Sequence, residues 1–163
     1  MSAFYDLSDV DRFVPGTVGV PGARTFFVQI GASAQVISLK CEKLQVSALS
    51  DALRKILTDL PPVRPGDLPK MMELQGPLQP EFAIGSIGLG YEADSDRILV
   101  LFEEAVAEET GSPDAGQVRV ALTRAQALAF AGRGEELVAG GRPNCVLCGS
   151  PIDTTGYSCV CFN

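Results

Sequence analysis

The sequence of 163 residues contains no histidine and no tryptophan. The absence of histidine excludes Ser-His and Cys-His nucleophile pairs, histidine general bases and histidine metal ligands. Any catalysis would have to use carboxylates, cysteines, lysines or tyrosines instead. The absence of tryptophan removes the most favourable side chain for stacking and cation–π contacts. We therefore expect no catalytic constellation in this chain, and an enzyme is the less favoured reading.

Long apolar runs and basic runs are also missing. The longest uninterrupted apolar runs, residues 98–102 and 127–131, are far shorter than the roughly 20 residues that a membrane-spanning helix needs. Residues 1–11 contain three aspartates and lack the basic leader and apolar stretch of a secretion signal. The net charge of −7 disfavours nucleic-acid binding, which gains affinity by neutralising phosphates. We therefore expect a cytoplasmic protein with no membrane and no nucleic-acid partner.

Several short segments have the composition of β-strands. Two pairs of segments rich in β-branched and aromatic residues are each separated by a turn-forming sequence, which is typical of hairpins. The first pair is at residues 25–30 and 35–39, and the second pair is at residues 82–92 and 97–103. A further strand is expected at residues 117–122. Near the start of the chain, a strand at residues 12–14 is expected to lead into a loop, because Pro15-Gly16 and Pro21-Gly22 are turn signals.

Two segments have the spacing of amphipathic helices. Apolar residues recur at helical spacing from residue 42 to residue 60, and two prolines end the pattern because proline lacks the amide donor. Residues 61–80 form a long proline-rich connection. The second helix is predicted to begin at Thr123, where Gln126 three residues later completes a capping box, and to end at a pair of glycines.

These elements predict one α+β domain over residues 1–140, with both helices on one face of an antiparallel sheet. The length and the 46% hydrophobic content suffice for a single core. Residues 141–163 are expected to form a tail that packs on this domain. Each half consists of about three strands followed by a helix, and a Gln-Val pair at Gln35 recurs at Gln117 when the register is shifted by one residue. A duplicated βββα unit and a coincidence both remain open.

The tail is distinguished by its cysteines. Four of the five cysteines lie in the last nineteen residues, namely Cys145, Cys148, Cys159 and Cys161. The first pair has the Cys-x-x-Cys-Gly spacing of a zinc knuckle, and the spacer contains turn-forming residues that return the chain to the first pair. We therefore predict a structural Zn²⁺ ion held by all four thiolates, with Cys161 as the least certain ligand.

A physical argument favours zinc over the other uses of these thiols. A tail of this length cannot bury a useful core, whereas ordering it around zinc contributes on the order of 10 kcal/mol. A redox Cys-x-x-Cys pair and an iron–sulfur centre are the alternatives. Redox chemistry favours a pair that opens a helix, but Gly149 and Pro151 follow here. Cys41 stands apart at a strand–helix junction, and we expect it to be a small, partly buried apolar residue rather than a reactive thiol.

Three blocks of sequence resemble the actinobacterial DUF3090 family. They are residues 12–19 (RFVPGTVG), 21–27 (PGARTFF) and 141–149 (GRPNCVLCG). Members of this family tend to occur beside a kinase-like and a histidine-phosphatase-like protein, so the resemblance implies an accessory role with one of these neighbours as partner. The chain departs from the family pattern at Tyr157, which stands where a histidine ligand is usual. Cys161 could supply the replacement thiolate.

Other candidate sites are weaker. Arg12 and Arg24 flank a Pro-Gly loop and could bind a carboxylate or phosphate in bidentate fashion. Residues 85–90 contain three glycines, and a glycine-rich strand explains them better than a phosphate loop, because no helix is predicted to follow. Acidic residues near the second hairpin could bind a hard cation, but solvated surface acids are the simpler interpretation.

Two hypotheses about function follow. The first is a zinc-stabilised accessory or adaptor protein whose surface docks on a protein partner. The second is an enzyme or sensor for a small phosphorylated or carboxylated metabolite that uses Arg12 and Arg24.

Overall fold

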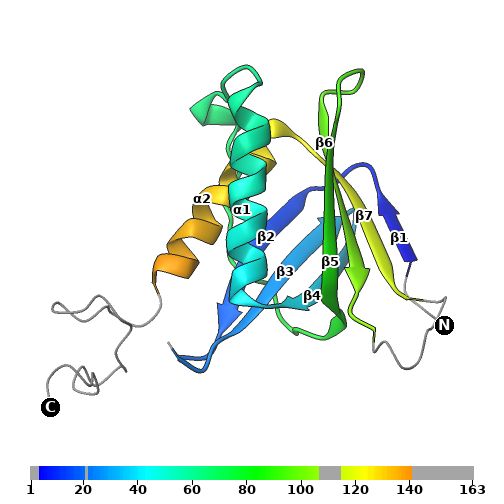
Figure 1. Ribbon diagram of the computed structural model, residues 1–163, viewed down its shortest axis with the longest axis vertical. Helices are drawn as coiled ribbons and strands as arrows, with labels where there is room; N and C mark the ends of the chain where they lie inside the picture. The colour runs from blue at the N-terminus through cyan, green and yellow to red at the C-terminus, as the bar shows by residue number, and fades with distance from the viewer. Residues whose placement is uncertain (1–3, 21, 107–114, 141–163) are drawn as a thin grey trace, which may run out of the picture.

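The computed structural model describes residues 4–20, 22–106 and 115–140 (Figure 1). This part of the chain contains seven strands and two α-helices, which confirms the α+β class. None of its helices is long and apolar enough to cross a membrane. The elements in chain order are β1 (Phe4–Leu7), β2 (Arg12–Val18), β3 (Thr25–Ala32), β4 (Gln35–Cys41), α1 (Lys43–Thr58), the 3₁₀ turn η1 (Pro65–Asp67), β5 (Pro80–Glu92), β6 (Arg97–Glu104), β7 (Gln117–Leu122) and α2 (Arg124–Ala139).

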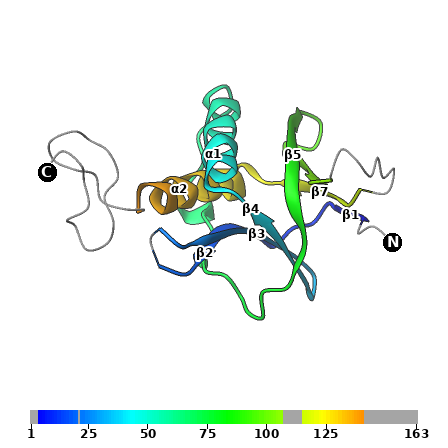
Figure 2. The same cartoon turned by 60° about the horizontal axis from the view of Figure 1, so that its bottom comes forward.

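The two helices pack against each other on one face of the sheet, as Figure 2 shows for the side of β2, β3 and β4. Their apolar residues share one core with alternate residues of the strands. In α1 the buried positions include Val46, Leu49 and Leu53, which are spaced so that they lie on one side of the helix. Phe130 of α2 lies against the ring of Phe13, with ring centroids 4.7 Å apart. The periodicity of the sequence therefore identified the buried faces.

The sheet is mixed, which corrects the prediction of a purely antiparallel sheet. The strand order is β1-β7-β6-β5-β4-β3-β2. The pairs β1–β7 and β4–β5 are parallel, and the other neighbours are antiparallel. The chain leaves β4, passes through α1 and the long connection, and enters β5, and such a crossover makes two neighbouring strands parallel. Hairpin signals in a sequence reveal antiparallel neighbours but not crossovers, and β1 was not expected at all.

Both halves of the chain use the same pairing scheme. The first residues of β5 pair in parallel with β4, and the rest of β5 pairs antiparallel with β6. In the first half, two separate strands make the equivalent pairings: β1 pairs in parallel with β7, and β2 pairs antiparallel with β3. Each half then continues with two more strands and a helix. The register also repeats, since Val28 lies opposite Leu39 in the first half and Val100 lies opposite Val120 in the second.

Two glutamines anchor the helices at equivalent places. Gln45 and Gln126 each occupy the third position of a helix and accept a hydrogen bond from the backbone N–H of the capping residue, at 2.8 Å and 2.9 Å. The side-chain amide of Gln45 donates to the carbonyl of Ile84, and that of Gln126 donates to the carbonyl of Val10. Ile84 and Val10 are the places where the chain changes from a parallel to an antiparallel partner. The capping box at Thr123 is thus confirmed, and its link to the sheet is new.

The long connection before β5, residues 61–79, is called the strap from here on. Its first part lies beside the helices, and the part around Leu74 and Gln75 lies on the face of the sheet that is turned away from them. The two backbone hydrogen-bonding groups of Gln75 bind the side-chain amide of Gln29, each at 2.8 Å. The side chain of Leu74 lies over Gly16, where a Cβ atom would come within 2.3 Å of it. Gln29 is consequently 0% exposed, so the strap gives the first half of the sheet a second buried face.

Candidate functional site

The predicted zinc ligands Cys145, Cys148, Cys159 and Cys161 lie outside the described residues, as does Tyr157. The zinc knuckle and the packing of the 141–163 tail therefore stay predictions. Within residues 4–20, 22–106 and 115–140, no three His, Cys, Asp or Glu side chains gather around a point where a metal ion would fit.

Arg12 and Arg24 do not converge on a common ligand. Arg12 is at the end of the β2–β3 hairpin where it pairs with Gly31, and Arg24 precedes Thr25 at the opposite end. Arg12 donates to the backbone carbonyl of Glu73 in the strap. Arg24 donates to the backbone carbonyl of Leu137 at 2.9 Å, and its guanidinium lies 4.9 Å from the centroid of the Phe26 ring. The strand register thus places the two arginines at opposite ends of the hairpin. Arg12 holds the strap to it, and Arg24 holds the end of α2 to it.

The glycine-rich segment at residues 85–90 is part of strand β5, in agreement with the strand interpretation. A turn and strand β6 follow it, so its geometry differs from a phosphate loop that leads into a helix. The acids near this hairpin have separate environments. Glu104, for example, accepts a hydrogen bond from the backbone of Gly116 at 2.8 Å. Among the described residues, no three of the acids near this hairpin surround a point where a cation would fit. These acids are Glu81, Glu92, Asp94, Asp96, Glu103 and Glu104.

Cys41 is a buried thiol at the end of β4, as expected from the sequence. Burial in the core raises the pKa of this thiol to about 12, and the neighbouring carboxylate of Glu42 adds to the shift. A thiol with such a pKa stays protonated at neutral pH and is a poor nucleophile. Cys41 therefore acts as a packing residue.

This shift predicts a loss of stability in alkaline solution. The unfolded chain can ionise Cys41 above its ordinary pKa of 9.0, whereas the folded chain keeps the thiol neutral up to about 12. The contribution of Cys41 is therefore fully present below pH 9 and is lost between pH 9 and pH 12. Denaturant unfolding of the natural chain and of Cys41→Val should give free energies whose difference changes in this window and is constant below it. A difference that is independent of pH would contradict the assignment.

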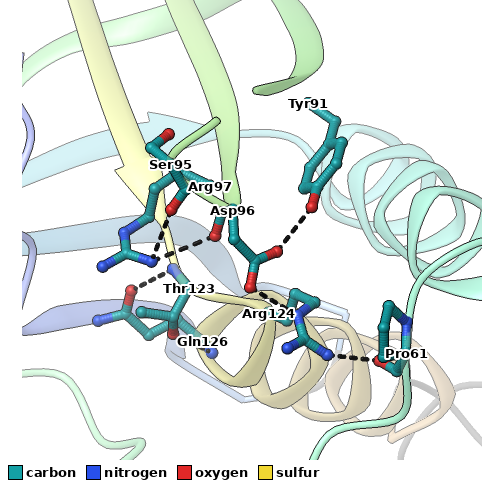
Figure 3. A network of polar contacts seen from close by, with 8 residues as sticks. All are labelled: Pro61, Tyr91, Ser95, Asp96, Arg97, Thr123, Arg124 and Gln126. Atoms are coloured by element: carbon teal, nitrogen blue, oxygen red, sulfur yellow. Dashed lines mark hydrogen bonds and ion pairs between the residues drawn. The ribbon is translucent and has the colours of Figure 1, made fainter. Parts of the chain in front are cut away.

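A network of charged side chains joins three distant segments (Figure 3). The carboxylate of Asp96, in the β5–β6 turn, accepts hydrogen bonds from the Tyr91 hydroxyl at 2.7 Å and from Nε of Arg124 at 3.1 Å. Arg124, in the first turn of α2, also donates to the carbonyl of Pro61 at 2.6 Å. The hydrogen bond from Tyr91, with help from Arg124, lowers the pKa of the Asp96 carboxyl. The network thus holds the turn, the helix and the beginning of the strap together.

Beside this network is a cavity of about 390 Å³, called the arginine pocket. Arg64, Arg97 and Arg124 are among the residues that line it. The backbone N–H groups in the first turn of a helix have no acceptor within that helix, and Ala125 lies at this position. The three arginines outnumber the two carboxylates of the lining, Asp67 and Asp96, so an anionic group would be compatible with the remaining positive charge. The lining residues are Pro62, Val63, Arg64, Asp67, Asp96, Arg97, Thr123, Arg124 and Ala125.

A larger groove of about 740 Å³ lies between the strap and the helices, and it is called the methionine groove. Its strap side carries Met71 and Met72, and Met71 is 72% exposed. Its helix side includes Arg54, which forms two hydrogen bonds with Glu135 at 2.6 Å and 3.0 Å. The lining residues are Arg54, Leu68, Pro69, Lys70, Met71, Met72, Glu73, Leu128, Ala129, Gly132, Arg133 and Glu136.

Comparison with known proteins gives the family. The family model described as "Protein of unknown function (DUF3090)" matches residues 5–159. The chain belongs to the DUF3090 family. The match covers nearly the whole chain and confirms the resemblance inferred from the sequence blocks. The searches of curated proteins and of solved structures gave no match. The DUF3090 family description assigns no reaction.

Sequence reasoning missed both cavities for a simple reason. Their residues come from segments far apart in the chain, such as Arg64, Arg97 and Arg124, and no spacing connects them. One signal was present for the methionine groove. Two adjacent methionines, Met71 and Met72, lie in the proline-rich connection, and flexible apolar side chains in a loop are typical of a contact surface.

Proposed function

We propose that this DUF3090 protein is a non-catalytic accessory protein that binds a partner protein in the methionine groove. The observation that supports the proposal is that Met71 and Met72 of the strap face residues of α1 and α2 across a groove of about 740 Å³, with Met71 exposed. Methionine side chains are flexible and polarisable, and they adapt to the apolar side chains of different partners. The groove has the volume of a pocket that encloses a few side chains.

The charges of the groove indicate the chemistry of the partner. Arg54 is bound to Glu135, and Arg133 is 3.1 Å from Glu136, so these cations are already neutralised. Lys70 has no hydrogen-bond or ion-pair partner within the described part of the chain. A partner segment with apolar side chains and a neighbouring carboxylate would complement Lys70 and the methionines. The kinase-like and phosphatase-like neighbours implied by the family resemblance are the partners to test first.

Calorimetric titration of the purified full-length chain with each of these two neighbours tests the proposal. Binding of either one should weaken at least tenfold in Met71→Glu, because the new carboxylate replaces an apolar contact and repels an acidic partner. Leu44→Glu is the matched control, since Leu44 is 82% exposed on α1 and is not part of the groove lining. Absence of binding to both neighbours, or equal affinity of Met71→Glu and the natural chain, would refute the docking site.

The structural role of zinc is part of the same proposal. Four thiolates at Cys145, Cys148, Cys159 and Cys161 would complete a closed tetrahedral site, which holds a tail in place and leaves no position for a substrate. The support is the type and spacing of the donors in the sequence.

The zinc site predicts the metal content of the purified protein and of its cysteine variants. The purified chain should contain about one zinc ion per molecule by elemental analysis, and Cys148→Ser should lose it because a neutral hydroxyl replaces a thiolate ligand. Cys41→Ser is the matched control, since Cys41 is buried in the core far along the chain from the tail, and it should keep its zinc when it folds. A metal-free natural chain grown with ample zinc would exclude the site, and retention of zinc by Cys161→Ser would remove Cys161 from the ligand set.

A second candidate function is supported by the arginine pocket. We propose it as the site at which the protein would sense a small phosphorylated or carboxylated metabolite, in place of the separated pair Arg12 and Arg24. Thermal-shift titration with inorganic phosphate, a phosphate monoester and a dicarboxylate should show saturable stabilisation that Arg64→Ala abolishes and Arg119→Ala preserves. Arg64 is suited to this test because it is exposed and is not a donor in the network around Asp96. Equal shifts in both variants would exclude the pocket.

A further inference from the structure

The outer face of the sheet, which points away from the helices, is treated differently in the two halves. In the first half the central part of this face is formed by Val14, Gly16, Phe27 and Gln29, and all four are buried. The strap accounts for this burial, because Leu74 lies on Gly16 and the backbone of Gln75 binds Gln29. The cover is thus the segment that follows the helix of the same half.

The equivalent face of the second half has no such cover among the described residues. The strand register identifies the equivalent residues. The pair Gly90 and Leu99 corresponds to Gly16 and Phe27. The pair Gly88 and Leu101 corresponds to Val14 and Gln29. Gly88 is exposed, and Gly90, Leu99 and Leu101 are half-buried. A Cβ atom at Gly90 would meet no described atom within 4 Å, whereas one at Gly16 would collide with Leu74. The result is a smooth apolar strip along β5 and β6.

We propose that the 141–163 tail covers the strip formed by Gly88, Gly90, Leu99 and Leu101, as the strap covers its equivalent in the first half. The argument is the repeated arrangement of the two halves. The strap follows α1, covers the outer face of β2 and β3, and is held at its beginning to the β5–β6 turn by Arg124. The tail follows α2, whose last turn is held to the β2–β3 hairpin by Arg24. Exchanging the halves places the tail over β5 and β6.

The tail has the length and composition for this position. It begins after Gly140 and is slightly longer than the strap. Its apolar residues suit a strip of leucine and glycine, and burial of such surfaces is favourable at about 25 cal/mol per Å². They are Val146, Leu147, Ile152, Val160 and Phe162.

The two halves differ in one respect that shapes the contact. Gln29 holds the strap by two hydrogen bonds, but Leu101 stands at the equivalent position and has no polar group. The contact of the tail would therefore be apolar at this point and would lack the amide clamp.

The natural absence of tryptophan provides a clean reporter for this proposal. Leu101→Trp introduces a single tryptophan into the strip of the full-length chain. Its emission should be blue-shifted, and acrylamide should quench it several-fold less than the tryptophan of Leu44→Trp, which is on the exposed side of α1. Replacing residues 144–163 of the Leu101→Trp chain by a Gly-Ser sequence of equal length should raise the quenching to the level of the control.

A stability measurement makes the test independent of the bulk of tryptophan. Leu101→Asp should lower the melting temperature of the natural chain by several degrees, because a carboxylate is placed under the tail. The same substitution should have little effect in the chain with the Gly-Ser tail, where the new carboxylate would be solvated beside Arg119. Three results would overturn the proposal: a Leu101→Trp chain quenched as strongly as the control, protection that survives the tail replacement, or protection that grows with protein concentration and so comes from a second copy.

Discussion

Replacing Gln29 with alanine should lower the free energy of unfolding by about 3 kcal/mol. The side chain of Gln29 is completely buried, and its amide binds both the N–H and the carbonyl of Gln75. Leaving one buried donor or acceptor without a partner costs about 1–3 kcal/mol, and this substitution removes the partner of two partly buried backbone groups. The lost packing of the side chain adds to the cost. Release of the strap into water would relieve part of the penalty, so the strap should also loosen.

Urea unfolding followed by circular dichroism measures the first effect, and limited proteolysis within the strap measures the second. Gln35→Ala is the matched control, because Gln35 is an exposed glutamine at the beginning of β4 and should change the free energy of unfolding by less than about 0.5 kcal/mol. The strap of Gln29→Ala should be cleaved faster than that of either the natural chain or Gln35→Ala. A loss below about 1 kcal/mol with unchanged cleavage would show that Gln29 does not hold the strap.

Replacing Gly134 with alanine should lower the free energy of unfolding by about 2 kcal/mol, because the two helices cross closely at this residue. An added Cβ atom would come within 2.2 Å of Oγ of Ser50 and within 3.2 Å of Cγ1 of Val46. Ser50 is itself buried, and its hydroxyl has no hydrogen-bond partner in the described structure. The collision and the unsatisfied hydroxyl therefore occur at one place.

The double variant Ser50→Ala/Gly134→Ala separates this collision from other effects. Removing the hydroxyl leaves the Ser50 Cβ atom at 3.5 Å from the new methyl group, which is an ordinary contact. In the Ser50→Ala background, Gly134→Ala should therefore be close to neutral, since the higher helix propensity of alanine offsets the remaining contact of 3.2 Å with Cγ1 of Val46. The pair should show a coupling free energy of about 2 kcal/mol in a double-mutant cycle.

Gly132 offers the control for this cycle within the same helix. A Cβ atom there would meet only the end of the Arg54 side chain, at 3.9 Å, so Gly132→Ala should stabilise the protein by about 0.5–1 kcal/mol. Equal effects of alanine at Gly132 and at Gly134, or additive effects of Ser50→Ala and Gly134→Ala, would show that the helices do not touch as described.

The local elements were predictable because each has a local cause. The apolar spacing of Val46, Leu49 and Leu53 indicated α1, and all three are buried. The capping box of Thr123 and Gln126 marked the beginning of α2. Hairpin signals located β3 with β4 and β5 with β6 to within a few residues. The class, the helices and most strands are therefore written in patterns that span only a few residues.

The candidate sites could not be predicted from local patterns. Arg12 and Arg24 looked like a pair because only a short segment separates them in the sequence. They lie at opposite ends of a hairpin because each strand residue advances the chain by about 3.3 Å. Arg64, Arg97 and Arg124 line one pocket although no pattern links them. Proximity in space here arises from long-range pairing, which leaves no trace in local spacing.

The sequence by itself determined the composition of each element, the side of each element that turns to the core, the family and a set of four thiols suited to zinc. The tertiary structure alone decided the parallel pairings, the cover of the strap over β2 and β3, and the strip on β5 and β6 that no described residue covers. The physical reason is that a periodic pattern records whether a surface is apolar, whereas the identity of the segment that buries it depends on the path of the whole chain.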